Sequence, residues 1–294
     1  MGERELMTSL ELNKLIDSRY ILFRHVASGG MADIYEAQDV ILNKPVALKF
    51  LKEKYLEDPD SVEQFKNESR FVSIFNHPNI LHIYNVGQYG GRLYVSYELL
   101  KGKTLKDNLD NRGKISIDEA LDYMSQILLG VKEMHELGIL HNDLKPDNLY
   151  LLHDGTIRIV DLGAASHISS KIEKHILGTI NYLAPEVVTS RKYSTQSDIY
   201  SLGIILYEFL TGEVPFSYEN SKDILKVHNK DEIVKVKEQY ITVNVNDINY
   251  IINKAIYFNP SHRYKSAKEF LDDLNKIKAH LPIKKEGPLK KEFK

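Results

Sequence analysis

The stretch "HNDLKPDN", residues 141–148, concentrates two aspartates, two asparagines and one lysine in a single short segment. Such a segment is too polar for a buried core. Pro146 also disfavours a helix, because proline lacks the backbone N–H that a helix interior needs. We therefore expect a loop that holds acidic groups, a cation and an amide close together, and this combination predicts a chemical site rather than an ordinary turn.

Composition limits the class of protein. With 294 residues the chain is long enough for two domains, and 43% hydrophobic and 27% charged residues are typical of a soluble globular protein. The formal net charge of −2 gives no overall attraction to nucleic acid or to a membrane surface. The absence of cysteine excludes disulfides and suits a cytoplasmic location. No apolar run approaches the ~20 residues of a transmembrane helix.

The first third of the chain predicts mostly strands. Segments rich in β-branched and aromatic residues lie at 19–27, 32–38, 44–51 and 92–100. Between them, Val62, Phe65, Val72 and Phe75 recur at helical spacing and predict a helix over 59–75. The segment "HPNI", residues 77–80, should end this helix, because the residue before a proline resists the α conformation.

The rest of the chain predicts helices over 116–138, 197–212, 248–258 and 266–280. Two of them begin with capping boxes, formed by Ser116 with Glu119 and by Ser266 with Glu269. The segment 197–212 is apolar nearly all round, which predicts a buried helix. We expect an α+β protein with an N-terminal extension (1–18), a small β-rich lobe with one helix (19–100), a larger mainly helical lobe (101–280) and a lysine-rich flexible tail (281–294).

Five motifs follow one another in a fixed order: "ASGGMADIY" at 27–35, "VALK" at 46–49, "HNDLKPDN" at 141–148, "DLG" at 161–163 and "APE" at 184–186. In this order the sequence resembles the eukaryotic-type (Hanks-type) serine/threonine protein kinase family. "GGM" and "GTINYLAPE" look like its bacterial branch. The resemblance covers roughly residues 20–280. It implies the bilobal protein-kinase fold, ATP and Mg²⁺ as cofactors, and a protein substrate with a serine or threonine acceptor.

The resemblance also implies roles for single residues. Asp143 would accept or orient the proton of the acceptor hydroxyl, and Lys145 would stabilise the phosphoryl group in transfer. Asn148 and Asp161 would bind Mg²⁺, which prefers oxygen ligands. Thr179 would frame the acceptor together with Asp143 and Lys145.

A larger set of residues would bind the nucleotide. Lys49 would contact the α- and β-phosphates, and a helix glutamate would orient it. We favour Glu68 over Glu63 because Glu68 lies nine residues before His77, as in the family. The full set of nucleotide-binding candidates is Ala27, Gly29, Gly30, Ala32, Ile34, Ala47, Lys49, Glu68, Tyr97, Glu98, Leu100 and Tyr150.

Three positions depart from the family pattern. Ala27 and Ala32 stand where the phosphate loop has glycine, and their methyl groups stiffen the loop. Leu162 replaces the commoner phenylalanine of the "DFG" motif. Asn142 replaces an arginine that in many kinases receives a phosphate on the activation loop. We therefore expect a kinase that does not depend on activation-loop phosphorylation and is either constitutively active or controlled by a regulatory partner.

Two structural interactions are implied as well. Asp198 would bind the backbone of the catalytic loop, and Glu186 would form a buried ion pair with Arg263. Other functions stay open at this point: a pseudokinase that binds or scaffolds, suggested by Ala27 and Ala32, or a kinase of small molecules. No basic stripe points to a nucleic-acid partner.

Overall fold

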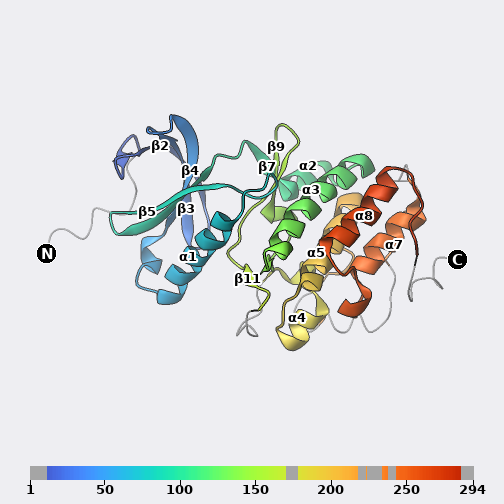
Figure 1. The fold of residues 1–294 in the computed structure, drawn as a ribbon. Helices are drawn as coiled ribbons and strands as arrows, with labels where there is room; N and C mark the ends of the chain where they lie inside the picture. The colour runs from blue at the N-terminus through green and yellow to red at the C-terminus, as the bar shows by residue number, and fades with distance from the viewer. Residues whose placement is uncertain (1–11, 170–177, 218–222, 224–233, 238–242, 286–294) are drawn as a thin grey trace. The chain divides into compact units, whose positions relative to one another are not determined.

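The computed structural model describes residues 12–169, 178–217, 223, 234–237 and 243–285 (Figure 1). These residues form two compact units. One unit contains residues 12–76 and Leu81–Lys101. The other contains His77–Ile80 and the described residues from Gly102 onward. Each unit has its own hydrophobic cluster, so each is described separately.

The first unit is built on a six-stranded antiparallel sheet of order β1-β2-β3-β4-β6-β5. Its strands are β1 (Leu15–Ile16), β2 (Tyr20–Ser28), β3 (Ala32–Asp39), β4 (Lys44–Leu51), β5 (Ile83–Tyr89) and β6 (Arg92–Glu98). Four of them confirm strands predicted from the sequence. Residues 15–16 lie in the predicted N-terminal extension and add β1 to the edge of the sheet.

Alternation along the strands separates two faces of this sheet. One face carries a buried cluster that includes Tyr20, Leu22, Val46, Leu48 and Phe50. The residues between them point to the other face. Helix α1 (Pro59–Ile74) follows the 3-10 turn η1 (Glu53–Tyr55), has proline in its first turn and buries Phe65, Glu68, Ser69 and Val72. The helix predicted over 59–75 is therefore confirmed.

Residues 77–80 belong to the second unit, although the sequence assigned them to the β-rich lobe. The Asn79 side chain donates to the carbonyl of Ile157 (3.0 Å) and to Gln126 (3.1 Å). Ile80 forms a parallel bridge with Ile159. These contacts attach the segment to elements that come much later in the chain, and such pairing cannot be read from local sequence.

The second unit is mainly helical, as predicted. Its described helices are α2 (Leu105–Arg112), α3 (Ile117–Glu136), α4 (Pro185–Ser190), α5 (Thr195–Thr211), α7 (Val245–Ala255) and α8 (Ala267–Lys278). Short 3-10 turns occur at η2 (Pro146–Asn148), η3 (Ile180–Tyr182) and η5 (Pro260–His262). Two small sheets join β7 (Gly102–Thr104), β9 (Leu149–Leu152) and β10 (Ile157–Ile159) in one, and β8 (Ile139–Leu140) and β11 (Ser166–His167) in the other.

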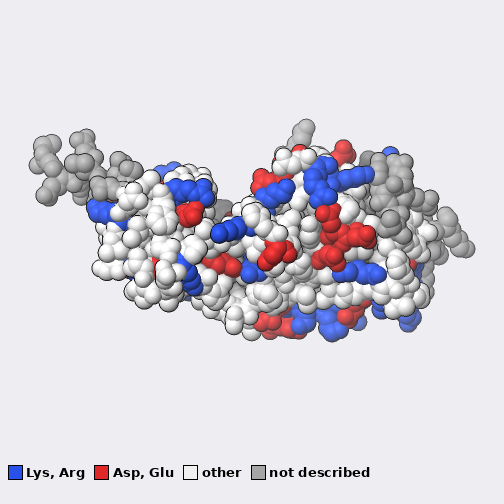
Figure 2. Space-filling model, turned by 90° about the horizontal axis from the view of Figure 1, so that it is seen from above, with Lys and Arg blue, Asp and Glu red and all other residues white. Residues whose placement is uncertain are grey.

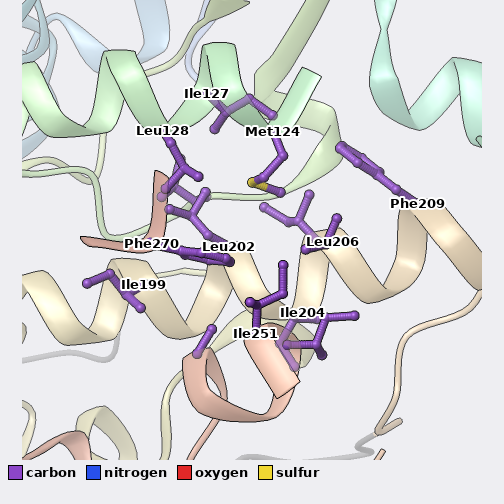
Figure 3. Packing of buried hydrophobic residues seen from close by; sticks show 14 of the residues in the cluster. Met124, Ile127, Leu128, Ile199, Leu202, Ile204, Leu206, Phe209, Ile251 and Phe270 are labelled. Atoms are coloured by element: carbon purple, nitrogen blue, oxygen red, sulfur yellow. The ribbon is translucent and has the colours of Figure 1, made fainter. Parts of the chain in front are cut away.

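Helix α5 is the centre of the core of the second unit (Figure 3). Met124 and Leu128 of α3 contribute to this core, and so do Leu202 and Leu206 of α5 and Phe270 of α8. Every residue of α5 from Ser197 to Leu206 is buried, which confirms the helix predicted to be apolar all round.

On the face seen in Figure 2, basic and acidic side chains lie interspersed over the described residues.

Two helices begin at the predicted serines, but only the capping box of Ser116 and Glu119 is complete. At the start of α8 the Glu269 carboxylate accepts from the Lys265 amide (2.8 Å) rather than from Ser266. The Ser116 hydroxyl accepts from the Glu119 amide at the start of α3, and the Ser266 hydroxyl accepts from the Glu269 amide at the start of α8. Helix α2 was not predicted because "LKDNLDNR" lacks an apolar repeat. Its one sequence signal is a capping box formed by Thr104 and Asp107.

The predicted flexible tail begins in contact with the second unit. Ile283 is buried, and the Lys285 ammonium lies 2.7 Å from the carboxylate of Asp247 at the start of α7. Residues 286–294 lie outside the described part of the chain. Within the described residues, no helix combines the length and the apolar character that membrane crossing requires.

Candidate active site

The nucleotide-binding candidates of the first unit include a partly buried ion pair. The Lys49 ammonium lies 2.6 and 2.8 Å from the two carboxylate oxygens of Glu68 in α1, and Glu68 is only 5% exposed. The Tyr97 hydroxyl lies 3.4 Å from the same carboxylate. The rival acid, Glu63, forms an exposed pair with Arg70 instead.

Strand register gathers several of these candidates on one face of the sheet. Ile34 pairs with Lys49 across β3 and β4, and Tyr97 pairs with Ala47 across β4 and β6. Ala27 pairs with Ile34 across β2 and β3. Because directly paired residues point to the same side of a sheet, all five side chains share the face that also carries the ion pair.

The phosphate loop connects β2 to β3 as a tight hairpin in which the Gly29 amide donates to the Ala32 carbonyl (2.9 Å). The two alanines differ in their surroundings. Ala27 is exposed, whereas Ala32 is 4% exposed at the start of β3. A methyl group on Gly30 would meet no atom within 4 Å, and one on Gly29 would lie 3.5 Å from the Ala32 carbonyl oxygen. Space therefore does not require glycine at either position in this conformation.

Two further candidates lie at the end of β6. The Glu98 backbone amide donates to the His82 carbonyl (3.0 Å), and the Glu98 side chain accepts from the His82 amide (2.9 Å). Leu100, two residues further on, is half-buried. Tyr150, a candidate in the second unit, lies on β9, and its hydroxyl donates to the Gly102 carbonyl (3.0 Å). Burial raises the pKa of Tyr150, so its phenol stays neutral.

The second unit arranges polar groups around Asp143. One carboxylate oxygen accepts from the amide and the hydroxyl of Thr179, at 2.8 and 2.9 Å. The other oxygen lies 2.9 Å from the Lys145 ammonium and 3.2 Å from the amide nitrogen of Asn148. Lys145 also donates to the Thr179 hydroxyl at 2.8 Å. A carboxylate and a cation thus hold one hydroxyl group between them.

Asn148 and Asp161 offer oxygen atoms beside this group. The side-chain nitrogen of Asn148 donates to Asp143, so the side-chain oxygen of Asn148 points away from Asp143. The Val160 backbone amide donates to the backbone carbonyl of Asn148 (2.9 Å). This bond brings Asp161, the next residue, close to Asn148 in the fold. Asp161 has a φ of 61° and accepts from the Gly163 amide (3.3 Å).

Asp198 binds the backbone of the predicted catalytic loop, residues 141–148, as the sequence led us to expect. Its two carboxylate oxygens each accept from a backbone amide, that of His141 and that of Asn142, both at 3.0 Å. Burial opposes the charge of this carboxylate. The interactions with His135 and with His141 and its backbone amide outweigh burial and keep the pKa of Asp198 below its usual value. The partner His135 (2.8 Å) was not predicted.

Asn142 makes an interaction that sequence reasoning also missed. Its side-chain nitrogen donates to the Ala164 carbonyl (2.8 Å) and to the Ser166 hydroxyl (2.9 Å). Ser166 also pairs with Leu140 across β11 and β8. The catalytic loop is thus tied by neutral hydrogen bonds to the segment after Asp161. The other residues considered there, Ser170, Lys171 and Lys174, lie outside the described part of the chain.

The ion pair of Glu186 and Arg263 is confirmed. Both guanidinium end nitrogens lie 2.8 Å from Glu186 oxygens in a two-point contact, and Arg263 is 3% exposed. Arg263 also donates to the carbonyls of Tyr257, Phe258 and Gln196. All three guanidinium nitrogens of Arg263 therefore donate hydrogen bonds within the second unit.

The comparisons with known proteins agree with this fold and these motifs. The model of the protein kinase domain matches residues 20–280, and the chain belongs to that family. The chain is similar to serine/threonine-protein kinase PrkC of Bacillus subtilis, with 36% identity over 266 residues. It is 31% identical over 272 residues to serine/threonine-protein kinase PknA of Mycobacterium tuberculosis.

These alignments cover 90% of this chain but only part of each relative, 41% of PrkC and 62% of PknA. The chain also matches a probable serine/threonine-protein kinase PknB of Lactococcus lactis, 30% identical over 90% of this chain and 43% of that protein. The chain thus spans less than two thirds of the length of these curated relatives.

Proposed function

We propose that this chain is a serine/threonine protein kinase that transfers the γ-phosphoryl group of ATP to protein hydroxyls. The observation that carries the proposal is the Thr179 hydroxyl held between the Asp143 carboxylate and the Lys145 ammonium. A serine or threonine acceptor needs the same two partners, one to take its proton and one to balance the charge of the phosphoryl group.

Asp143 acts as the proton acceptor in this proposal. Asn148 positions it, because the Asn148 amide donates to both the backbone and the side chain of Asp143. Lys145 lies on the same carboxylate and stabilises the phosphoryl group in transfer. The hydroxyl proton passes to Asp143 as the acceptor oxygen bonds to phosphorus and the γ-phosphoryl group leaves ADP.

Asn148 and Asp161 are the proposed ligands of Mg²⁺, and their donor chemistry fits this ion. Both offer oxygen, which Mg²⁺ prefers, and Asp161 is exposed. Within the described residues, no group of three or more histidine, cysteine, aspartate or glutamate side chains could hold a metal. This suits an ion that takes most of its ligands from phosphates and water. When bound, Mg²⁺ neutralises charge on the phosphate oxygens.

On the nucleotide side, Lys49 binds the α- and β-phosphates and Glu68 orients it. The contact of the Lys49 ammonium with both Glu68 oxygens supports this assignment. Ile34, Ala47 and Tyr97 on the same face of the sheet form the proposed adenine-binding surface.

We also propose that the kinase does not need a phosphorylated activation loop. An asparagine at position 142 has no charge with which to bind a phosphate, and its amide already holds Ala164 and Ser166. The kinase is then constitutively active or controlled by a partner.

Since the sequence contains no cysteine, we also propose that the kinase acts in the cytoplasm on protein substrates there.

The test is transfer of labelled phosphate from ATP to peptide libraries that offer serine, threonine or tyrosine. We expect Mg²⁺-dependent labelling of serine and threonine and little labelling of tyrosine. Asp161→Ala should abolish transfer while the circular dichroism spectrum stays unchanged. Predominant tyrosine labelling would contradict the acceptor assignment, and no transfer by a folded wild-type chain would favour a binding role.

A further inference from the structure

Charged groups gather around Asp33, immediately after the phosphate loop and outside the residues discussed so far. Its carboxylate accepts from the hydroxyl of Ser28 (2.7 Å). Ser28 is the last residue of β2 and pairs with Asp33 across the two strands. The Lys52 ammonium lies 3.7 Å from one carboxylate oxygen, and the Arg92 guanidinium lies 3.6 Å from the other. One carboxylate thus faces two permanent cations, which leaves a surplus of positive charge beside the loop.

Arg92 is the most rigidly held charged residue of this cluster. Its side chain is 7% exposed, donates to the Leu51 carbonyl (3.0 Å) and lies over the Phe50 ring. A guanidinium held at these points is a fixed cation beside Asp33. The Asp33 carboxylate, which also accepts from Ser28, lies between this cation and Lys52 and positions the Lys52 ammonium.

Lys52 contacts the loop at two points. Its ammonium donates to the Gly29 carbonyl, and its backbone amide donates to the Met31 carbonyl (2.9 Å). The C=O and N–H of one trans peptide point in opposite directions. Fixing the Gly29 carbonyl on Lys52 therefore turns the Gly30 N–H away from Lys52. Within the described part of the chain, this N–H has no hydrogen-bond partner.

We propose that Lys52 and Asp33 are positioning residues that hold the Gly29–Gly30 peptide so that the Gly30 N–H is presented to nucleotide phosphate. Backbone N–H groups aligned in this way bind anions, and the surplus positive charge reinforces the attraction. The inference rests on the proposed kinase function. In this proposal the loop, which has alanine at positions 27 and 32, is held in a phosphate-binding conformation by the charge cluster. It does not depend on the backbone freedom that glycine would give at these positions.

The test compares nucleotides with and without phosphates. Affinities of ATP, ADP and adenosine are measured by calorimetry for the wild type and for Lys52→Met. We expect ATP and ADP to bind about tenfold more weakly to the variant, as for loss of one charge-assisted hydrogen bond. Adenosine should bind equally well, because it lacks the phosphates. Lys52→Arg should recover most of the ATP affinity.

Lys54→Met is the matched control, because Lys54 is an exposed lysine on the next turn whose ammonium lies over the Tyr55 ring. It should change no affinity. If Lys52→Met does not fold, Lys52→Leu removes the same ammonium with another apolar side chain, and the same loss confined to ATP and ADP is expected.

Equal losses for adenosine and ATP would show a general structural role and overturn the inference, as would unchanged ATP affinity in both folded variants. Failure of the wild type to bind ATP would instead overturn the proposed kinase function, and the inference with it.

Discussion

The side-chain amide of Asn142 lies 2.9 Å from the hydroxyl of Ser166, and this bond connects the predicted catalytic loop, residues 141–148, to the segment after Asp161. Asn142 has a φ of 68°, a left-handed conformation that asparagine tolerates better than most residues. The residue therefore suits its backbone position and connects the two segments through an uncharged hydrogen bond.

Phosphorylation of the loop should matter little. A Ser169→Ala/Ser170→Ala variant treated with phosphatase should keep its initial rate on a fixed peptide within about threefold of the phosphorylated wild type. Ser166 is left intact because its hydroxyl is used by Asn142. A tenfold drop, about 1.4 kcal/mol of transition-state stabilisation, would mean that another cation receives a phosphate.

Asp198→Asn should change the pH dependence of stability. The folded pKa of Asp198 is lowered, so its contribution is fully present above the unfolded value near 3.9 and is lost as the pH falls through the folded pKa. At pH 7 the variant should lose about 3 kcal/mol, because a buried charge partner is removed. Urea unfolding between pH 7 and pH 3 should show a shallower acid decline for the variant. Identical slopes would contradict this account.

Arg263→Met should lower the free energy of unfolding by about 3–5 kcal/mol, since it removes a fully buried guanidinium and leaves Glu186, which is largely shielded from solvent, without its charge partner. Arg112→Met is the control. It removes an exposed pair with Glu119 and should cost less than about 1 kcal/mol. Thermal denaturation of both variants measures the difference, and equal shifts in melting temperature would show that burial does not set the cost.

Ala32→Gly tests the phosphate loop. The sequence suggested that this methyl group obstructs the approach of the backbone to phosphate, so that removing it would preserve or improve ATP affinity. In the structure Ala32 is buried at the start of β3. We therefore expect a loss of about 0.5–1 kcal/mol in stability from glycine in a strand, with ATP affinity preserved. A tenfold weaker ATP affinity would show that Ala32 also supports the loop itself.

Local sequence patterns predicted the elements that carry strong apolar or capping signals. Helix α5 is apolar all round, and α3 begins at a capping box, so both could be predicted without tertiary information. Strand β5 could not, because none of its residues is fully buried and it contains Gly87, where a larger side chain would meet the Tyr94 ring.

The motifs of the candidate site could be read from the chain because their residues are close in sequence or follow a known order. The supporting contacts could not. Asn142 meets Ser166, and His135 meets Asp198, only because the fold brings separate segments together. The charge cluster around Asp33 likewise depends on Arg92, which comes from a distant strand.

The most direct test of the account is steady-state kinetics of Asp143→Ala with ATP and a serine peptide. Asp147→Ala is the control, an exposed aspartate on the same loop. Loss of a positioned base should lower kcat by at least about 100-fold, while the KM for ATP changes little and Asp147→Ala behaves like the wild type. Near wild-type turnover in Asp143→Ala would contradict the assignment of this loop as the site of phosphoryl transfer.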